Sequence, residues 1–597
     1  MNETKNKKAS LAIFIFCLIW GLFQIWYATL GMGVLDQYQV LWIYLMFALS
    51  LAFLVYPTSP KKGIAWYDIL LAIIATLPLL YLLLNHEYVI SGRIQNVTPL
   101  KPIEKVLGVL LIVLVLEATR RATGWALPIV ATFFIIYSLF GHYFPGSLYH
   151  ERVPPEIFLE DQYLLTLGIF GIPIMVAATV IIYFSIFGAL LQNIGLSDYF
   201  MEFAKAFVGH RRGGPAKVAV VSSGLMGMIS GSAVANVYGT GVITIPMMKK
   251  LGFPNYLAGA VEAAASTGGQ ITPPLMGAAA FVMAQFLGVD YIDVAIAAVI
   301  PALLYYIGMY MQISFEAQLK NLRALSPEEI PSKSHVLKRI YLLTPIAIVT
   351  VLLLLRYPVH QAVLATMGYT IVLIMVTETL RVYKATKDKE VVFEFAKSLG
   401  GSIATGTRQN IPMALAAATA GIVVGVITET GLGVRFASMV LRASHGIPWV
   451  AAILTAIVTV ILGMGIPTTP AYIITASLSA PALLKLGFPE LSVHMFILYY
   501  AALSAITPPV AMAAYAGATV AEAPFMKTAI TACRLGIVAF IMPFVFMYKP
   551  EILINYPAPI LAKLGWIGLL TAIVLVGLYM AYKFFGKRQG VPIRWEL

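Results

Sequence analysis

Long apolar runs follow one another along nearly the whole chain, and short polar stretches separate them. A run of about 20 apolar residues is long enough to cross the hydrocarbon core of a bilayer as a helix. The pattern therefore predicts a series of membrane-spanning helices. Plain spans are expected near residues 10–31, 38–56, 65–85, 104–118, 123–142, 171–194, 290–318, 338–357, 359–380, 408–431, 525–548 and 565–586.

Four further stretches are apolar but interrupted, because they are rich in Gly, Pro, Ser and Thr. They cover residues 215–250, 255–287, 447–486 and 490–520. Non-helical backbone at membrane depth is tolerated only where protein or a water-filled cavity satisfies its polar groups. We interpret the first and third stretches as re-entrant hairpins, and the second and fourth as broken helices that cross the membrane.

Short amphipathic stretches connect some of the spans, near residues 156–167, 197–208, 390–400 and 433–444. Their apolar residues recur at helical spacing among charged ones. Helices of this kind lie in the plane of the membrane surface. The alternative is that they are solvated connectors.

An internal repeat relates the interrupted stretches to one another. The sequence KLGFP at residues 250–254 recurs 235 positions later, and ITPP at residues 271–274 recurs at the same offset. An ungapped alignment that starts at Pro246 gives ten identities in 29 positions. The number of predicted crossings between equivalent points is odd, so the second copy is inverted relative to the first.

The predicted fold is therefore an all-α polytopic membrane protein with inverted repeats, at about residues 171–287 and 408–520. Inverted repeats with broken helices are the construction of secondary transporters, whose binding sites lie near the midplane of the membrane.

Composition and charge narrow the class of protein. Hydrophobic residues make up 60% of the 597 residues and charged residues only 11%, which excludes a water-soluble enzyme because such proteins carry about 25% charged residues. The net charge of +13 indicates basic cytoplasmic loops rather than nucleic-acid binding. Most Lys and Arg, including Lys61, Lys62, Arg211 and Arg212, fall on the side of the N-terminus, so both termini are predicted to be cytoplasmic.

The chain lacks the motifs that are typical of several other classes of protein. Cys17 and Cys533 lie far apart in apolar stretches, which gives no case for a disulfide framework or a transition-metal site. A membrane-embedded enzyme remains a distant alternative, since the chain has no H-E-x-x-H sequence and no nucleophile elbow. No P-loop supports direct driving by ATP. A proton-translocating respiratory subunit needs a chain of buried ionisable residues, and none accompanies Glu262.

The four interruptions carry the candidate chemistry. The hairpins turn at residues 228–236 and 463–469, and the broken helices are interrupted at 268–274 and 504–509. Hydroxyls and freed carbonyls at such places are hard oxygen ligands for a small cation. A helix that starts after the interruption points the positive end of its dipole at an anion. The alternative for any single interruption is a helix kink or close packing of small residues.

Glu262 is the second candidate. It lies eight residues past Pro254, which is about 12 Å into the membrane along a helix. A carboxyl group at this depth is by default a proton carrier or a cation ligand, and the alternative is a neutral acid bonded to the neighbouring hairpin. We interpret Glu117, near Arg120 and Arg121, as part of a structural ion pair, and Arg534 as a structural or snorkelling group.

The sequence resembles the fused membrane subunit of a tripartite ATP-independent periplasmic (TRAP) transporter of the TAXI branch. The resemblance rests on residues 230–236, 263–274, 463–469 and 507–509, and it covers essentially the whole chain. It implies a four-helix small-subunit-like domain at 1–121 and a large-subunit-like transport and scaffold domain at 122–597. It also implies an elevator mechanism in a bacterial inner membrane, with a periplasmic TAXI-type binding protein as partner.

The resemblance further implies where ions and substrate bind. Cation sites would use Ser230, Ser232, Asn236, Gly268, Gly269, Thr272 and Pro273 in one copy. In the other copy they would use Gly463, Gly465, Thr468, Thr469, Ser504, Thr507 and Pro508. Substrate is expected between the hairpin tips, at Ser232, Asn236, Thr468 and Thr469. The coupling ion is Na+ or H+, because Glu262 keeps proton coupling open, and no cofactor is expected.

We therefore expect ion-coupled uptake of small organic acids, with 2-oxoglutarate-like dicarboxylates as the leading substrate class. The alternative within transport is a stand-alone dicarboxylate symporter that needs no binding protein.

Overall fold

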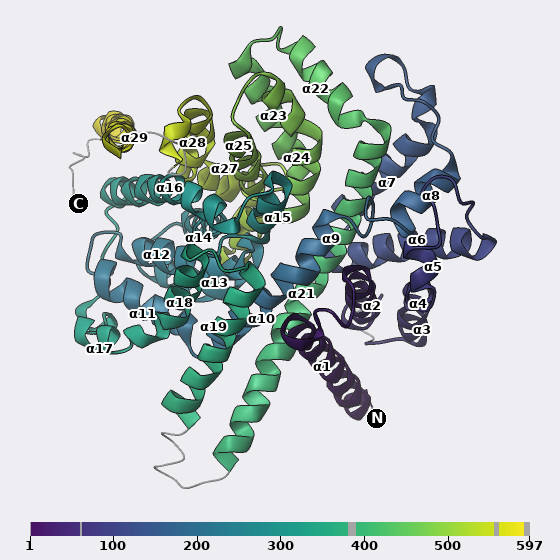
Figure 1. The fold of residues 1–597 in the computed structure, drawn as a ribbon. Helices are drawn as coiled ribbons and strands as arrows, with labels where there is room; N and C mark the ends of the chain where they lie inside the picture. The colour runs from purple at the N-terminus through teal and green to yellow at the C-terminus, as the bar shows by residue number, and fades with distance from the viewer. Residues whose placement is uncertain (1, 60–62, 380–389, 554–559, 590–597) are drawn as a thin grey trace. The chain divides into compact units, whose positions relative to one another are not determined.

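The computed structural model describes residues 2–59, 63–379, 390–553 and 560–589. The structure within these ranges is helical and contains no β-strand (Figure 1). Eight helices are long and apolar enough to cross a membrane, or up to ten if each of two bent pairs is one span. This confirms an all-α polytopic membrane protein. Lys61 and Lys62 lie outside the described residues.

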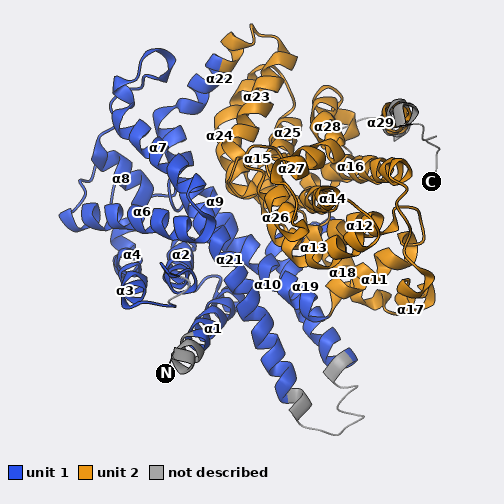
Figure 2. Ribbon diagram, turned by 180° about the vertical axis from the view of Figure 1, so that it is seen from behind, with its two compact units in different colours: residues 1–194, 351–439 blue, residues 195–350, 440–597 orange. Residues whose placement is uncertain are grey.

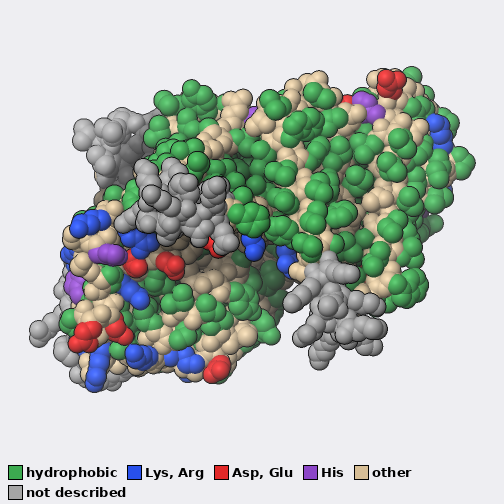
Figure 3. Space-filling view, turned by 90° about the horizontal axis from the view of Figure 1, so that it is seen from below, with side chains coloured by type: hydrophobic (Ala, Val, Ile, Leu, Met, Phe, Trp, Pro, Cys, Tyr) green, Lys and Arg blue, Asp and Glu red, His purple; other side chains and the backbone are tan. Residues whose placement is uncertain are grey.

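Two compact units make up the chain (Figure 2). Unit 1 holds residues 1–194 and 351–439, and unit 2 holds residues 195–350 and 440–597. Figure 3 shows hydrophobic side chains over large continuous parts of the face it displays, as a lipid-facing surface requires. Lys, Arg, Asp and Glu side chains gather mainly at the lower left of that face, with a few near its centre and at its upper right.

Unit 1 is assembled around one long helix, α21 (Glu390–Thr430). The helices that pack against it are α1 (Asn2–Trp26), α2 (Gln37–Val55), α6 (Pro102–Thr123), α7 (Ala126–Phe140) and α10 (Ile182–Asn193). Its other helices include α3 (Trp66–Ile74), α4 (Leu77–Leu84) and α19 (Val359–Ile374). Local sequence sets their ends: Asp36 caps α2 by accepting from the backbone N–H of Gln39 at 2.9 Å.

Helix α21 corrects one prediction. An amphipathic helix at 390–400 and a separate span at 408–431 are expected from the sequence, whereas the structure has a single helix of 41 residues. Gly406, which lies between the two stretches, serves packing rather than termination, because a Cβ there would lie 2.5 Å from the Ile186 Cα of α10. The other predicted amphipathic helices are present as α8 (Pro155–Tyr163), α11 (Leu196–Val208) and α22 (Leu432–Ala443).

Ion pairs that are buried or partly buried tie unit 1 together. Glu117 pairs with Arg120 and Arg121 at 2.7 Å each, which confirms the predicted structural role. Arg121 also reaches Asp68 of α3 at 2.7 Å. A pair that removes charge from hydrocarbon avoids the large cost of an isolated buried ion.

Unit 2 contains all four interrupted stretches, each as a pair of helices. The hairpins are α12 (Gly214–Ser230) with α13 (Ala233–Lys250), and α23 (Pro448–Gly463) with α24 (Thr468–Lys485). The broken helices are α14 (Asn255–Gly269) with α15 (Ala278–Leu287), and α25 (Glu490–Leu503) with α26 (Met512–Ala521). The predicted interruptions are therefore confirmed as breaks in the helices.

Helix α14 is the centre of unit 2. It packs against α12, α13, α26 and α27 (Phe525–Leu535). Glycines permit two of these approaches. A Cβ at Gly259 would lie 2.6 Å from the Gly517 carbonyl oxygen of α26, and a Cβ at Gly269 would lie 2.6 Å from the Gly227 carbonyl carbon of α12.

Other helices of unit 2 include α16 (Tyr291–Leu319), most of α18 (Thr344–Leu354), α28 (Ile537–Tyr548) and α29 (Ile560–Gln589). Arg534 of α27 pairs with Glu316 of α16 at 2.6 Å, so this arginine is a structural ion-pair partner.

Candidate functional site

The tip of the first hairpin is a tight turn between α12 and α13. Gly231 has φ +63°, a left-handed conformation that favours glycine. Ser232 caps α13 by accepting from the Ala235 backbone N–H at 3.4 Å. A Cβ at Gly231 would lie 3.4 Å from the Gly277 Cα, so the tip rests against the end of the break between α14 and α15. The structure thus brings the predicted tip and the predicted break together.

Asn236 links the hairpin to the broken helix. Its amide nitrogen donates to the Ser223 carbonyl and hydroxyl at 2.8 Å and to the Ser266 hydroxyl at 3.0 Å. Its side-chain oxygen Oδ1 is buried and has no hydrogen-bond partner among the described residues. A buried carbonyl oxygen without a donor is costly, and it is therefore a candidate ligand for a cation or a substrate hydroxyl.

Glu262 lies in a cage of hydroxyls. Ser223 of α12 donates to Oε1 at 2.8 Å, Thr244 of α13 donates to Oε2 at 2.5 Å, and Thr240 also donates to Oε1. The Glu262 side chain is fully buried. No Lys or Arg among the described residues forms an ion pair with it, in contrast to Asp68 and Glu117 of unit 1. These contacts agree with the alternative predicted for Glu262, a carboxyl group that is hydrogen-bonded to the neighbouring hairpin.

A chain of hydrogen bonds joins this cage to Asn236. The Ser223 and Ser266 hydroxyl oxygens are 2.9 Å apart, and both contact the Asn236 amide. The serines have 1% exposure or less, and Asn236 has 2%. Glu262 and Asn236 therefore belong to one buried polar network.

The carbonyls at the first break are mostly satisfied within the protein. Tyr291 donates to the Pro274 and Leu275 carbonyls at 2.8 and 2.7 Å. The Thr272 hydroxyl donates to the Gly268 carbonyl at 2.7 Å. This leaves the oxygen lone pairs of Thr272, rather than its proton, for a ligand. Thr272 and Pro273 are both partly exposed.

The second hairpin and break form a separate cluster. Gly465 has φ +73°, and Thr468 and Thr469 begin α24 directly after the turn. Ser504 donates to the Gly463 carbonyl at 3.1 Å, which joins the tip to the end of α25. Thr507 donates to the Leu503 carbonyl at 2.8 Å. Among the described residues no hydrogen bond joins the two tips to each other.

A family model described as the tripartite ATP-independent periplasmic transporter, DctM component, matches residues 110–556. The chain belongs to this DctM family. It is therefore a membrane permease of a transporter rather than an enzyme.

Individual TRAP permeases are also similar to the chain. The C4-dicarboxylate TRAP transporter large permease protein DctM of Pseudomonas aeruginosa is 25% identical over 392 residues, which are 65% of this chain and 86% of that protein. The protein of the same name from Vibrio cholerae is 24% identical over 394 residues, or 62% and 83% of the two chains. The sialic acid TRAP transporter large permease protein SiaM of Vibrio cholerae is 27% identical over 169 residues, or 28% and 39%.

The sequence analysis of this DctM-family permease missed the hydroxyls around Glu262. Thr240 and Thr244 are four residues apart on α13, so they share a face of the helix. This spacing, on the hairpin that comes before the buried Glu262, could have predicted that the two hydroxyls face the carboxyl group. Ser223 lies about 40 residues before Glu262, and nothing in the local sequence links the two.

Proposed function

We propose that this DctM-family permease is the fused membrane subunit of a TAXI-branch TRAP transporter. The family model begins at residue 110, which leaves three long apolar spans of unit 1 outside the matched region, at Ser10–Gly31, Gln37–Val55 and Trp66–Leu84. A four-helix small-subunit-like domain at 1–121 followed by a large-subunit-like domain at 122–597 accounts for this extra length. A TAXI-type periplasmic binding protein is the expected partner.

The hairpins and broken helices of unit 2 form two inverted repeats, and they carry substrate across the membrane by an elevator mechanism. The main support is that a hairpin followed by a broken helix occurs twice, at α12–α15 and at α23–α26. The two sets exchange partners: α15 packs against α24 and α25, whereas α26 packs against α13 and α14. Such interlocking favours movement of the hairpins and broken helices as one body.

Cations bind at the two tip-and-break clusters and substrate binds between the tips. The first cluster holds Ser230, Ser232, Asn236, Gly268, Gly269, Thr272 and Pro273, and the second holds Gly463, Gly465, Thr468, Thr469, Ser504, Thr507 and Pro508. The free Oδ1 of Asn236 supports the first site. The position equivalent to Asn236 is Pro470, so the two sites differ in chemistry.

Glu262 supplies proton coupling. With Glu262 ionised, Thr240 and Thr244 donate to the carboxylate. With Glu262 protonated, a hydroxyl that accepts its proton can turn to a backbone carbonyl instead, since Thr240 Oγ1 lies 2.9 Å from the Asn236 carbonyl and Thr244 Oγ1 lies 3.2 Å from the Thr240 carbonyl. The cage can therefore satisfy both protonation states by rotating hydroxyls.

The substrates are small carboxylates, with 2-oxoglutarate-like dicarboxylates as the leading class. The relatives named for C4-dicarboxylates and for sialic acid support a carboxylate. Uptake occurs across a bacterial inner membrane, with both termini cytoplasmic. The competing function is a stand-alone dicarboxylate symporter, which would have the same site and no need of a binding protein.

Uptake of labelled 2-oxoglutarate into proteoliposomes tests this function. The purified full chain is reconstituted, and an Na+ gradient or a pH gradient is imposed with and without the cognate binding protein. Accumulation driven by a pH gradient and dependent on the binding protein is the expected result. Accumulation without the binding protein would favour the stand-alone symporter, and accumulation driven only by Na+ would reject proton coupling.

Hydroxyls at the tips are expected to set the apparent affinity for a metal cation such as Na+ at the two tip-and-break clusters, apart from the proton that Glu262 carries. Ser232→Ala and Thr468→Ala each remove one oxygen ligand, so the ion concentration that gives half-maximal uptake should rise about tenfold, the effect of one lost bond to a charged group. Thr519→Ala, at an exposed site on α26, is the matched control. Unchanged ion affinity in both tip variants would remove these residues from the site.

A further inference from the structure

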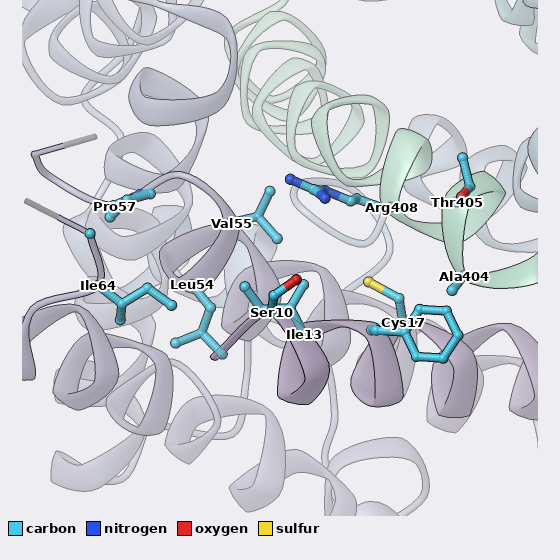
Figure 4. Close-up of a pocket in the computed structure, with 12 residues that line it drawn as sticks. Ser10, Ile13, Cys17, Leu54, Val55, Pro57, Ile64, Ala404, Thr405 and Arg408 are labelled. Atoms are coloured by element: carbon cyan, nitrogen blue, oxygen red, sulfur yellow. The ribbon is translucent and has the colours of Figure 1, made fainter. Parts of the chain in front are cut away.

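Unit 1 contains a cavity of about 330 Å³ between α1, the end of α2 and α21. Its walls combine apolar side chains, with Ile13 and Phe14 from α1 and Leu54 and Val55 from α2, and polar groups of Ser10, Thr405 and Arg408. Figure 4 shows the side chain of Arg408 extending from α21 toward Val55, with Ser10 and Ile13 of α1 nearby. None of the predicted site residues lines this cavity.

The cavity lies where several spans reach the membrane surface. Ser10 is the first residue of the candidate span Ser10–Gly31, and Val55 is the last residue of Gln37–Val55. Ile64, another lining residue, lies two positions before the span Trp66–Leu84 begins. The ends of spans mark the boundary between hydrocarbon and headgroups, so the cavity opens at headgroup level and continues inward along α1 as far as Cys17.

Arg408 is the charged residue of this cavity. No Asp or Glu lines the cavity, and Arg408 forms no ion pair or hydrogen bond with another described side chain. The arginines of the same unit at 120 and 121 do have carboxylate partners. An arginine in a membrane helix normally pairs with an anion or faces water. Arg408 is exposed, so its positive charge is open to an anionic group that enters the cavity.

We propose that this cavity binds an anionic phospholipid, with Arg408 holding the headgroup phosphate. The guanidinium group matches phosphate oxygens through two parallel hydrogen bonds. Hydroxyls of Ser10 and Thr405, which also line the cavity, are further possible donors. An acyl chain leaves along the exposed apolar surface of α1, where Phe14 and Ile15 are 37% and 43% exposed.

Native mass spectrometry of the full-length protein with added lipid tests this proposal. Wild-type protein is expected to retain phosphatidylglycerol in preference to zwitterionic phosphatidylcholine. Arg408→Ala should weaken phosphatidylglycerol binding about tenfold, the effect of losing a hydrogen bond to a charged group, and leave phosphatidylcholine binding unchanged. Arg408→Lys should retain most of the preference, because it keeps the charge.

Two further arms separate the alternatives. Arg442→Ala, at an exposed arginine on α22, should bind lipid as wild type does. Inorganic phosphate at the same concentration should not displace phosphatidylglycerol, since it lacks the acyl chains that the apolar walls contact. Equal binding of the two lipids by wild type, equal binding of phosphatidylglycerol by wild type and Arg408→Ala, or displacement by phosphate would each overturn the proposal.

Discussion

Glu262→Gln is expected to abolish substrate accumulation driven by a pH gradient and to leave counterflow exchange intact. If one proton accompanies each substrate, a gradient of about 1 pH unit supports about tenfold accumulation. Gln cannot release a proton, so the gradient no longer drives transport and the internal concentration should only equal the external one. Gln keeps the length of Glu and can still bond to Ser223 and Thr244, so the cage should survive. Uptake and counterflow in proteoliposomes measure the two activities.

The matched control is Glu490→Gln, at an exposed carboxylate that begins α25. It should accumulate substrate as the wild type does. Normal pH-driven accumulation in the Glu262→Gln protein would show that Glu262 does not carry the coupled proton and has a structural role. Loss of counterflow together with accumulation would indicate a folding or substrate defect rather than loss of coupling.

Gly269→Val is expected to have the largest effect on stability. The new Cβ would lie 2.6 Å from the Gly227 carbonyl carbon and 3.0 Å from the Met228 backbone nitrogen, and backbone cannot rotate away as a side chain can. Forcing α12 and α14 apart should destabilise the protein by about 3 kcal/mol. The midpoint of thermal unfolding and the yield of monodisperse protein measure this effect.

Gly239→Val is the control for that substitution. Gly239 lies on α13 of the same hairpin, and a Cβ there meets nothing within 4 Å. Its unfolding midpoint should stay close to that of the wild type, apart from the small intrinsic helix preference. Equal midpoints for the two variants would show that α12 and α14 can separate at this point without cost.

The interruptions of the helices were predictable because their cause is local. The Gly, Pro, Ser and Thr residues at 268–274 and 504–509 disfavour a continuous helix whatever the tertiary contacts. Both helices are interrupted at these places in the structure. The burial of Glu262 followed from its distance along a helix from Pro254. Glu117 was recognised as an ion-pair residue because its partners are three and four positions away.

The features that could not be predicted from the sequence depend on contacts between residues that are far apart in the chain. The partners of Arg93 are Glu104 and Glu160, and the second is 67 positions away. The continuity of α21 depends on its packing with α10, which overrides the weak helix preference of its glycines. The positions of Ser223, Thr240 and Thr244 around Glu262 depend on how α12, α13 and α14 meet.

The crossing of α14 and α26 has a mechanical consequence. Gly259, where the backbone of α14 touches that of α26, is three residues before Glu262 and therefore one helical turn away. A rigid backbone contact this close cannot absorb a displacement of the turn that carries Glu262. Any shift of that turn when the carboxyl gains or loses its proton is passed directly to α26, so a change in charge in one broken helix becomes a movement of the other.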